Sequence, residues 1–537
     1  MPKVELTECD LIEIIRLRDQ DKLTQSSIAK IFGVTQGNIS HFLAKKTHTE
    51  FWEAHERKPI ASGKLDKPRD NLRILEGKRF FITSAQNNTH AFKDGLRAIK
   101  RYCKEVDAQL IVGRYTYNKN GFQNGTNQDD LWFDREVRDH IINEPCQLAE
   151  GLIFCGNINS LPTVQNPLNR FQNYYGLDSI IIPHAKQQML SGSTPMHDDA
   201  KLMYTTGTVT QKNYIQKTPG QIAEWNHIFG GLIVEIDGDG DWFVRQVNIE
   251  SDTGNFYDLT NYYTPTITQT DCRVLAINWG DLHVAKLNGY IQDACWGSIQ
   301  HSLQGILDPD YVFLHDVHDH NSRNHHNIKD CYEMFRRFTN KKESVKDEVQ
   351  KTVDVITDMQ WCSDTNIVVV ESNHDKALER WLKEQDYKRD PVNAVFFLQM
   401  QLAMYESIEE GVQHHTFEYA CALVNDGPLN AQFLRTDESF RLKGVEFGQH
   451  GDKGSGGARG SIASFVKQGV KFNVGHSHGA AIKDGVFQAG VCMKPCDSGY
   501  VSGGCNWSLS HIITYHNSKR TIITMKQKAN GEWRFRA

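Results

Sequence analysis

The chain has 537 residues, of which 39% are hydrophobic and 23% charged, and its formal net charge is −6 at pH 7. This length predicts several domains of ordinary size, and the absence of a run of about 18 apolar residues excludes a predicted membrane span. Because DNA affinity depends on neutralising phosphates, the acidic balance argues weakly against DNA binding and leaves local basic patches as the route to it.

The N-terminal sequence MPKVELTECDLIEIIRL has no apolar stretch followed by a cleavage site, so no secretory signal is expected. The twelve cysteines are scattered without a CxxC pair, a pattern typical of reduced thiols inside a cell. We therefore expect a cytoplasmic protein that makes no use of a membrane.

Residues 25–44, QSSIAKIFGVTQGNISHFLA, match a helix-turn-helix, and residues 1–48 are predicted to form this domain. Gly33 stands at the turn, and Thr35 is placed to cap the second helix. In such a unit the second helix lies in the major groove with its early residues on base edges. The expected DNA contacts are bases for Gln36, Asn38, Ser40 and His41, and phosphates for Lys45 and Lys46. The alternative is a small helical bundle used to form a homo-oligomer.

Residues 49–77 are polar and rich in Pro, Gly and Ser, which predicts an exposed linker. Residues 78–270 predict a central α/β domain of unknown role. It contains a strand at 79–85, a helix at 90–106, a strand at 108–117 and a hairpin that turns at residues 238–241. Neither a nucleotide-binding glycine motif nor an internal repeat is evident in the sequence.

Residues 271–537 carry the motifs with chemical content. GDLH (280–283), SNHD (372–375) and GHSHG (475–479) each follow a predicted β-strand. Between them, Asp316 follows the strand-like YVFL, and His450 lies in EFGQHGD. Carboxylate, imidazole and amide ligands together suit first-row divalent metal ions better than calcium.

This series resembles the signature of the calcineurin-like metallophosphoesterases, usually written DxH, GDxxD, GNH(D/E), GH and GHxH. The resemblance implies a four-layer β-sandwich flanked by helices, within a chain that is α/β (α+β) overall. It also implies two divalent ions, with Asp316 as the bridging ligand. The remaining ligands implied are Asp281, His283 and His478 for one ion, and Asn373, His450 and His476 for the other. His374 would face the substrate, and Asp375 would orient His374.

Two positions depart from the family pattern, since His315 and Ser372 stand where the family has glycine. Larger residues there imply a different loop geometry. Several further histidines crowd this region, and one of them could replace an assumed ligand: His315, His318, His320, His325 and His326.

The ligand series is similar to that of nucleases related to double-strand-break repair enzymes, and the chain as a whole is similar to host-DNA-degrading nucleases of large tailed bacteriophages. These resemblances imply a DNase that depends on two metal ions, with Mn²⁺ first and Fe²⁺, Zn²⁺ or Mg²⁺ as alternatives, and with DNA as its partner. Two other functions stay open. One is a phosphomonoesterase or protein phosphatase with the same metal site, and the other is a non-catalytic DNA-binding regulator.

Overall fold

The computed structural model describes residues 6–19, 23–44, 46–49, 51, 72–117, 132–195, 198–412, 415–495 and 501–537. The chain divides into two compact units, Met1–Arg69 and Asp70–Ala537. Each unit is described by itself.

The first unit contains three helices, which are α1 (Glu8–Asp19), α2 (Gln25–Phe32) and α3 (Gln36–Leu43). Gly33 ends α2 in the left-handed conformation with φ 64°, which glycine adopts at no steric cost. The Thr35 hydroxyl accepts a hydrogen bond from the backbone N–H of Asn38 at 3.2 Å, which caps α3. Both local predictions are therefore confirmed. The buried core of this unit includes Leu11, Ile14, Ile28, Ala29, Ile39 and Phe42.

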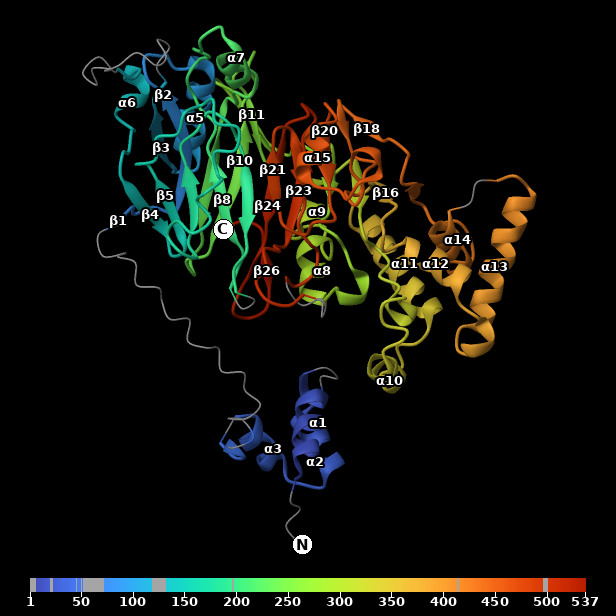
Figure 1. The fold of residues 1–537 in the computed structure, drawn as a ribbon. Helices are drawn as coiled ribbons and strands as arrows, with labels where there is room; N and C mark the ends of the chain where they lie inside the picture. Colours follow the sequence, from blue (N-terminus) through green and yellow to red (C-terminus); the bar gives the residue numbers. More distant parts are fainter. Residues whose placement is uncertain are drawn as a thin grey trace. The chain divides into compact units, whose positions relative to one another are not determined.

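Three large β-sheets make up most of the second unit (Figure 1). The eleven-stranded sheet has the order β1 (Arg73–Ile74), β4 (Pro145–Ala149), β5 (Leu152–Cys155), β6 (Ser179–Ile182), β8 (Lys201–Thr205), β7 (Met189–Gly192), β21 (Ala481–Lys483), β22 (Val486–Gln488), β20 (Lys471–Val474), β19 (Val445–Glu446) and β18 (Arg441–Leu442). Strands from both sides of the predicted boundary at residues 270 and 271 thus share one sheet.

Two further sheets pack on this one. The four-stranded sheet has the order β10 (Trp242–Asn248), β9 (Gly230–Ile236), β2 (Arg79–Gln86) and β3 (Gln109–Tyr115). The six-stranded sheet has the order β17 (Gln432–Leu434), β16 (Asn366–Val370), β15 (Tyr311–Leu314), β14 (Ala276–Asn278), β23 (Ser510–Thr514) and β24 (Arg520–Thr524). Smaller sheets join β11 (Phe256–Asp258), β12 (Asn261–Tyr263) and β13 (Thr268–Gln269), and also β25 (Lys526–Gln527) and β26 (Trp533–Arg534).

Helices cover the outer faces of these sheets. The α-helices are α5 (Lys93–Glu105), α6 (Arg135–Arg138), α7 (Thr218–Trp225), α8 (Gly289–Cys295), α9 (Leu303–Leu307), α10 (Cys331–Thr339), α11 (Val345–Cys362), α12 (Lys376–Glu384), α13 (Ala394–Glu409), α14 (Thr416–Val424) and α15 (Ile462–Val466). Short 3-10 helices are η2 (Val284–Lys286), η3 (Asn321–Arg323), η4 (Tyr387–Arg389) and η5 (Ser455–Gly457). Within the described segments, no helix is long and apolar enough to cross a membrane.

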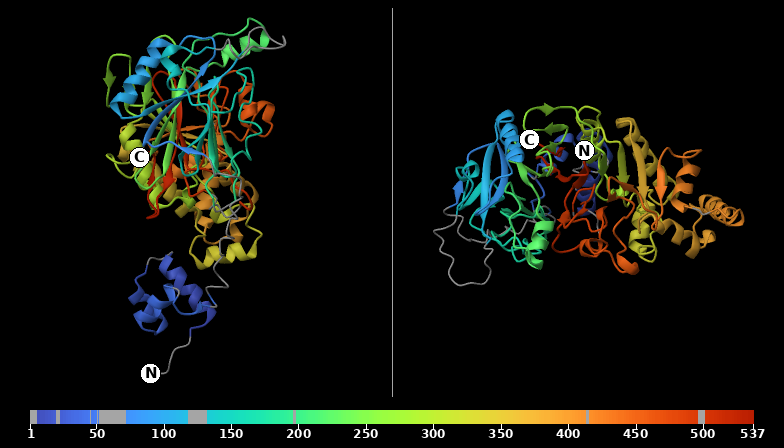
Figure 2. Two further views of the ribbon diagram at one scale, coloured as in Figure 1. Left: turned by 90° about the vertical axis from the view of Figure 1, so that its left-hand side faces the viewer. Right: turned by 90° about the horizontal axis from the view of Figure 1, so that it is seen from above.

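The period-two alternation of a β-strand explains how the six-stranded sheet is buried on both faces. Ile277 and Val312 face a core shared with the helices, whereas Ala276 and Phe313 face a second core shared with Val445 of β19. Seen from above, the first-half strands, the C-terminal strands and helices α11 to α14 follow one another across the second unit (Figure 2). The predicted mixed α+β class is confirmed.

Most of the strands predicted next to the motifs are present. VLAINW contains β14, TNIVVVE contains β16 and VKFNV contains β20, and each ends just before its motif. The central hairpin is also present, as β9 and β10, with its turn at the predicted residues. Because β14, β15 and β16 are parallel neighbours, their carboxyl ends meet at one edge of the sheet.

Candidate metal centre

Two groups of side chains meet at this edge of the sheet, and all of their members are buried except His476, which is half-buried. One contains Asp281, His283, Asp316 and His478, and its ligand atoms all lie within 4.8 Å of one another. The other contains Asp316, His450 and His476 under the same limit. Asp316 belongs to both groups, and the division of residues matches the one that the resemblance implies, apart from Asn373.

The two carboxylate oxygens of Asp316 face different groups. Oδ2 lies 3.9 Å from Nε2 of His283 and 3.9 Å from Nε2 of His478. Oδ1 lies 3.3 Å from Nε2 of His450. A carboxylate arranged in this way can contribute one oxygen to each of two ions.

Several buried polar atoms of these groups have no hydrogen-bond partner, as the ligand atoms of a cation would. They include Oδ1 of Asp281, Oδ1 of Asp316 and both ring nitrogens of His450. Since a buried unpaired polar atom is costly, such atoms are satisfied in native proteins by a partner, water or an ion. In addition, the Nε2 atoms of His283 and His478 face each other at 3.1 Å, as two imidazole ligands of one ion would. The donor set therefore fits divalent metal ions.

The backbone is held in an unusual conformation at four of these residues. His283, Asp316, His476 and His478 have φ values of 45°, 45°, 69° and 60°. Non-glycine residues rarely adopt this left-handed region, and such strain clusters at functional sites. In the loop where the family has glycine at the position of His315, the positive φ falls on the next residue, Asp316.

Gly475 leaves room for the first group. A Cβ atom at this position would lie 2.1 Å from Oδ1 of Asp281, well inside van der Waals contact. The next residue, His476, donates its backbone N–H to Oδ2 of Asp281 at 2.7 Å. Glycine is therefore required for the chain to pass this close to the carboxylate.

The electrostatics of the site favour a charged carboxylate at Asp316 and a cationic ring at His478. Burial opposes the charge on Asp316, but the surrounding histidines, His450 first, hold its pKa well below the usual value. Burial likewise opposes the charge on His478, but hydrogen bonds to Asp281 and Asp316 raise its pKa to about 9. This strongly polarised cluster is typical of a functional site.

His374 lies beside the first group. Its ring packs on the ring of His283 with centroids 5.0 Å apart, and its Nδ1 lies 3.5 Å from Oδ1 of Asp319. Burial opposes protonation, but the carboxylates of Asp316 and Asp319 raise the pKa of His374 to about 10. A cationic imidazole thus borders the cluster.

Two expectations about the SNHD loop require comment. Asp375 accepts hydrogen bonds from the backbone and hydroxyl of Ser372 and from the backbone of His318, so it closes its own loop. The carboxylate beside His374 is instead Asp319, which corrects the expectation that Asp375 orients His374. Asn373 follows β16 as predicted, and its side chain is exposed.

The neighbouring histidines do not join the two groups. His315 is fully buried beside His450, and burial lowers its pKa to about 4. His318 stacks on Phe417, and His320 packs against Trp381. The remaining pair, His325 and His326, stack on each other.

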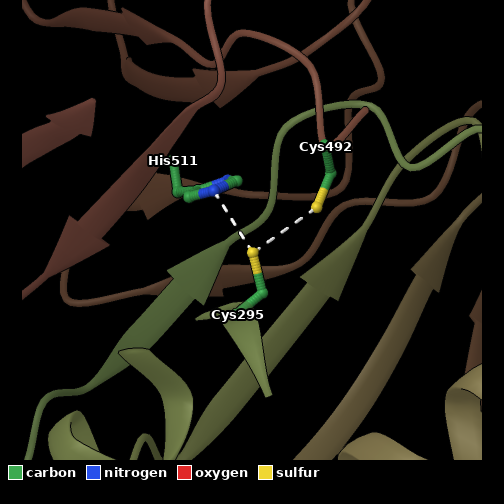
Figure 3. A group of neighbouring side chains, drawn as sticks. All are labelled: Cys295, Cys492 and His511. Atoms are coloured by element: carbon green, nitrogen blue, oxygen red, sulfur yellow. Dashed lines mark hydrogen bonds between the residues drawn. The ribbon is translucent and has the colours of Figure 1, made fainter. Parts of the chain in front are cut away.

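A third cluster consists of Cys295, Cys492 and His511 (Figure 3). It adjoins Asp281, because the backbone N–H of Cys492 donates to the carbonyl oxygen of Asp281 at 2.8 Å. The Sγ atoms are 3.8 Å apart, and Nε2 of His511 lies 3.7 Å from Sγ of Cys295. Nδ1 of His511 accepts the backbone N–H of Gly280 at 3.0 Å, so the neutral ring carries its proton on Nε2. That tautomer leaves no lone pair for a metal ion, and the cluster serves as buried packing beside the centre.

The cysteines near the C-terminus also differ from expectation. Cys492 is a free thiol, whereas Cys505 is disulfide-bonded, which corrects the expectation of reduced thiols throughout.

The proposed DNA contacts of the helix-turn-helix are mostly at its surface. Gln36, Asn38, His41 and Lys46 are exposed and Ser40 is half-buried, while Lys45 lies outside the described residues. Two of these side chains already have partners, since Gln36 donates to Gln25 at 3.0 Å and Asn38 bonds to Thr35.

Together, the fold and the site define a mixed α+β protein with a buried Asp/His centre suited to divalent metal ions. The chain is 39% identical over 488 residues to Protein A1 of Escherichia phage T5, covering 89% of this chain and 87% of that protein. The chain therefore belongs to the family of this bacteriophage protein. No protein-family model and no solved structure matches it.

Proposed function

We propose that the chain is a phosphodiesterase that depends on two divalent metal ions and acts on DNA. The observation that carries the proposal is the position of Asp316, whose two oxygens face separate groups of buried ligands. Two ions, when bound, would clamp a phosphate ester and supply a hydroxide nucleophile. Nucleases with a calcineurin-like centre, which the ligand series resembles, use such a pair of ions.

In this proposal, some residues of the site bind the metal ions and one acts on the substrate. Asp281, His283 and His478 hold one side of the centre, and His450 and His476 hold the other, with Asn373 as the further ligand that the resemblance implies. His374 acts on the substrate side. Its raised pKa keeps it protonated, so it can stabilise charge on the phosphate or donate a proton to the leaving oxygen.

The ligand set favours Mn²⁺ among the metals. Four histidines contribute to the two groups, and nitrogen ligands suit Mn²⁺, Fe²⁺ or Zn²⁺ better than Mg²⁺, which prefers oxygen.

DNA is the proposed substrate because the first compact unit of the chain has the form of a helix-turn-helix. Such a unit would bring a long polymer to the metal centre, which a phosphomonoesterase does not require. The family relationship to a bacteriophage protein supports phage infection as the setting, in which the proposed nuclease would degrade host DNA.

Other functions make different demands on the same residues. A non-catalytic regulator does not require a complete catalytic site. All eight positions of the signature nevertheless carry the side chains that catalysis needs, which are Asp281, His283, Asp316, Asn373, His374, His450, His476 and His478. A phosphomonoesterase would use the same metal centre, and only its substrate preference separates it from a nuclease.

One set of assays tests the proposal. The purified protein is incubated with Mn²⁺ and linear or circular DNA, and in parallel with p-nitrophenyl phosphate and bis-p-nitrophenyl phosphate. We expect hydrolysis of DNA and of the diester, loss of both activities in EDTA, and restoration by Mn²⁺ more than by Mg²⁺. Hydrolysis of the monoester alone would support the phosphatase, and full DNA hydrolysis in EDTA would refute a metal-dependent enzyme.

A further inference from the structure

The four-stranded sheet has the same arrangement as part of the six-stranded sheet. In the order β3-β2-β9-β10 the first pair is parallel and the next two pairs are antiparallel. The order β15-β14-β23-β24 shows the same three pairings in the same sequence. Each of these four strands thus has a counterpart in the other sheet.

The eleven-stranded sheet repeats itself about its centre. Outward from the centre, one side runs β7-β8-β6-β5-β4 and the other runs β21-β22-β20-β19-β18. On both sides the pairings are antiparallel, parallel, parallel and antiparallel. The central pair, β7 with β21, is antiparallel, as a twofold axis through the sheet requires.

The counterparts also follow the same order along the chain. β2 and β3 correspond to β14 and β15, and β4 to β10 correspond in order to β18 to β24. The second half has additional elements between β15 and β18, which are β16, β17 and helices α10 to α14. The cores agree as well, since α5 packs on the outer face of the four-stranded sheet as helices pack on the six-stranded sheet. The second unit therefore contains two copies of one fold, which corrects the expectation that the chain has no internal repeat.

The paired strands fix which residues correspond. Leu152 of β5 pairs with Ser179 of β6, and Val445 of β19 pairs with Lys471 of β20. Counting from these registers, and from those of β2, β3, β14 and β15, gives the first-copy residue at each metal-ligand position. The backbone N–H of Cys492 bonds to the carbonyl oxygen of Asp281, and the N–H of its counterpart Val209 bonds to that of Ser84, so Asp281 corresponds to Ser84. In the order Asp281, His283, Asp316, His450, His476 and His478, the counterparts are Ser84, Gln86, Arg114, Asn157, His184 and Lys186.

These replacements remove every carboxylate and place two cationic side chains where the second copy has ligands. Only His184 keeps the residue type of its counterpart, His476, and both of its ring nitrogens are engaged. Nδ1 accepts the backbone N–H of Lys186 at 2.9 Å, and Nε2 lies 3.1 Å from the carbonyl oxygen of Leu161. The neutral ring therefore carries its proton on Nε2 and has no free lone pair for a metal.

The first copy instead contacts the loop that carries His476 and His478. On β7, the hydroxyl of Ser191 donates to the carbonyl oxygen of Ala480 at 2.7 Å, two residues after His478. Beyond β7, Thr194 and Cys505 exchange two backbone hydrogen bonds of 2.9 and 2.8 Å. This second contact fixes the segment after Cys505, which includes Trp507. The ring centroids of Trp507 and His478 lie 4.2 Å apart.

We propose that residues 79–248 are a metal-free copy of the metal-binding half, and that Ser191 of this copy is a positioning residue for the His476–His478 loop. The first copy thus acts as a fixed partner within the same chain. The proposal concerns metal binding and does not depend on DNA being the substrate.

A pair of serine variants tests it. Ser191→Ala removes the bond to Ala480. Ser179→Ala is the matched control, because Ser179 is also buried and its hydroxyl accepts the Leu202 N–H within the first copy. In full-length protein, we expect Ser191→Ala to weaken Mn²⁺ binding by about 3- to 10-fold, the equivalent of one hydrogen bond. Ser179→Ala should leave the Mn²⁺ affinity unchanged. Equal effects of the two variants, or none from Ser191→Ala, would overturn the positioning role.

Two further measurements complete the test. Titration with Mn²⁺ should saturate at no more than two tight ions per chain, and tight binding that survives in Asp316→Ala would show a metal site in the first copy. If the wild type binds no Mn²⁺, the metal centre itself is wrong. The positioning role is then decided by the rate at which diethyl pyrocarbonate modifies His478 in metal-free protein, which Ser191→Ala should increase and Ser179→Ala should not.

Discussion

The Nδ1 atom of His283 lies 2.7 Å from a carboxylate oxygen of Asp319, and both side chains are buried. This contact places the imidazole proton on Nδ1 and turns the lone pair of Nε2 toward Asp316 and His478. A carboxylate behind a metal-binding histidine fixes its tautomer and raises its basicity. Asp319 therefore serves the centre without facing the ions.

Asp319→Asn should weaken Mn²⁺ binding by roughly 10- to 100-fold, because the tautomer of His283 is no longer fixed. Isothermal titration with Mn²⁺ measures the effect. The matched control is Asp308→Asn, which changes a half-exposed carboxylate paired with Arg273. An unchanged affinity in Asp319→Asn would show that the contact does not influence the ligand.

His374→Ala and Asp316→Ala should fail in different ways. The first variant should keep both ions and lower diester turnover by about 10²-fold or more, because it loses a proton donor or a charge-stabilising group. The second should lose metal, because the shared ligand is gone. Elemental analysis together with turnover of bis-p-nitrophenyl phosphate separates the two roles, and equal metal loss in both variants would contradict this assignment.

Deleting residues 1–47 should separate DNA binding from hydrolysis. This segment lies within the compact unit Met1–Arg69 and contains no metal ligand, so hydrolysis of bis-p-nitrophenyl phosphate should stay near wild type. Action on long DNA should weaken, most clearly at raised salt, where the remaining phosphate contacts are screened. Lys46→Ala should act in the same direction and reduce the salt slope by about one unit. If deletion instead dissociates an oligomer with no change in DNA affinity per protomer, the unit serves assembly.

His184 should make the fold sensitive to acid. Burial lowers its pKa from 6.5 to about 4, so the folded state resists a proton that the unfolded chain accepts. The contribution of neutral His184 to the free energy of unfolding is fully present above pH 6.5 and is lost as pH falls toward about 4. The loss is at most on the order of 3 kcal/mol. The Tm difference between wild type and His184→Gln should therefore shrink between pH 7 and pH 4.5. A constant difference would contradict this mechanism, and the exposed His301→Gln provides the control.

The ligands could be predicted from sequence because each follows an apolar strand, and parallel strands bring their carboxyl ends to one edge. Asp319 was harder to assign, since nothing in its spacing separates a carboxylate that faces a metal from one that faces a histidine. The assignment of Asp375 was wrong for a related reason, because adjacency to His374 in the chain does not determine where a side chain in a tight loop points.

The repeated fold could not be recognised from the sequence, because its two copies share their strand pairing but few of their side chains. Arg114 in the place of Asp316, and Lys186 in the place of His478, remove the motif by which the second copy is found. Only strand order and register reveal the relationship. The apolar residues that both copies need for their cores are interchangeable and carry no recognisable motif.

The continuous eleven-stranded sheet has a practical consequence for dissecting this protein. A fragment that begins at residue 271 would leave β21 without β7, and β24 without the Gln246 side chain, which accepts the backbone N–H of Ile522. Open strand edges of this kind invite aggregation. The metal centre is therefore not a portable module, and residues 72–270 and 271–537 should yield a soluble product only when they are produced together and complement each other.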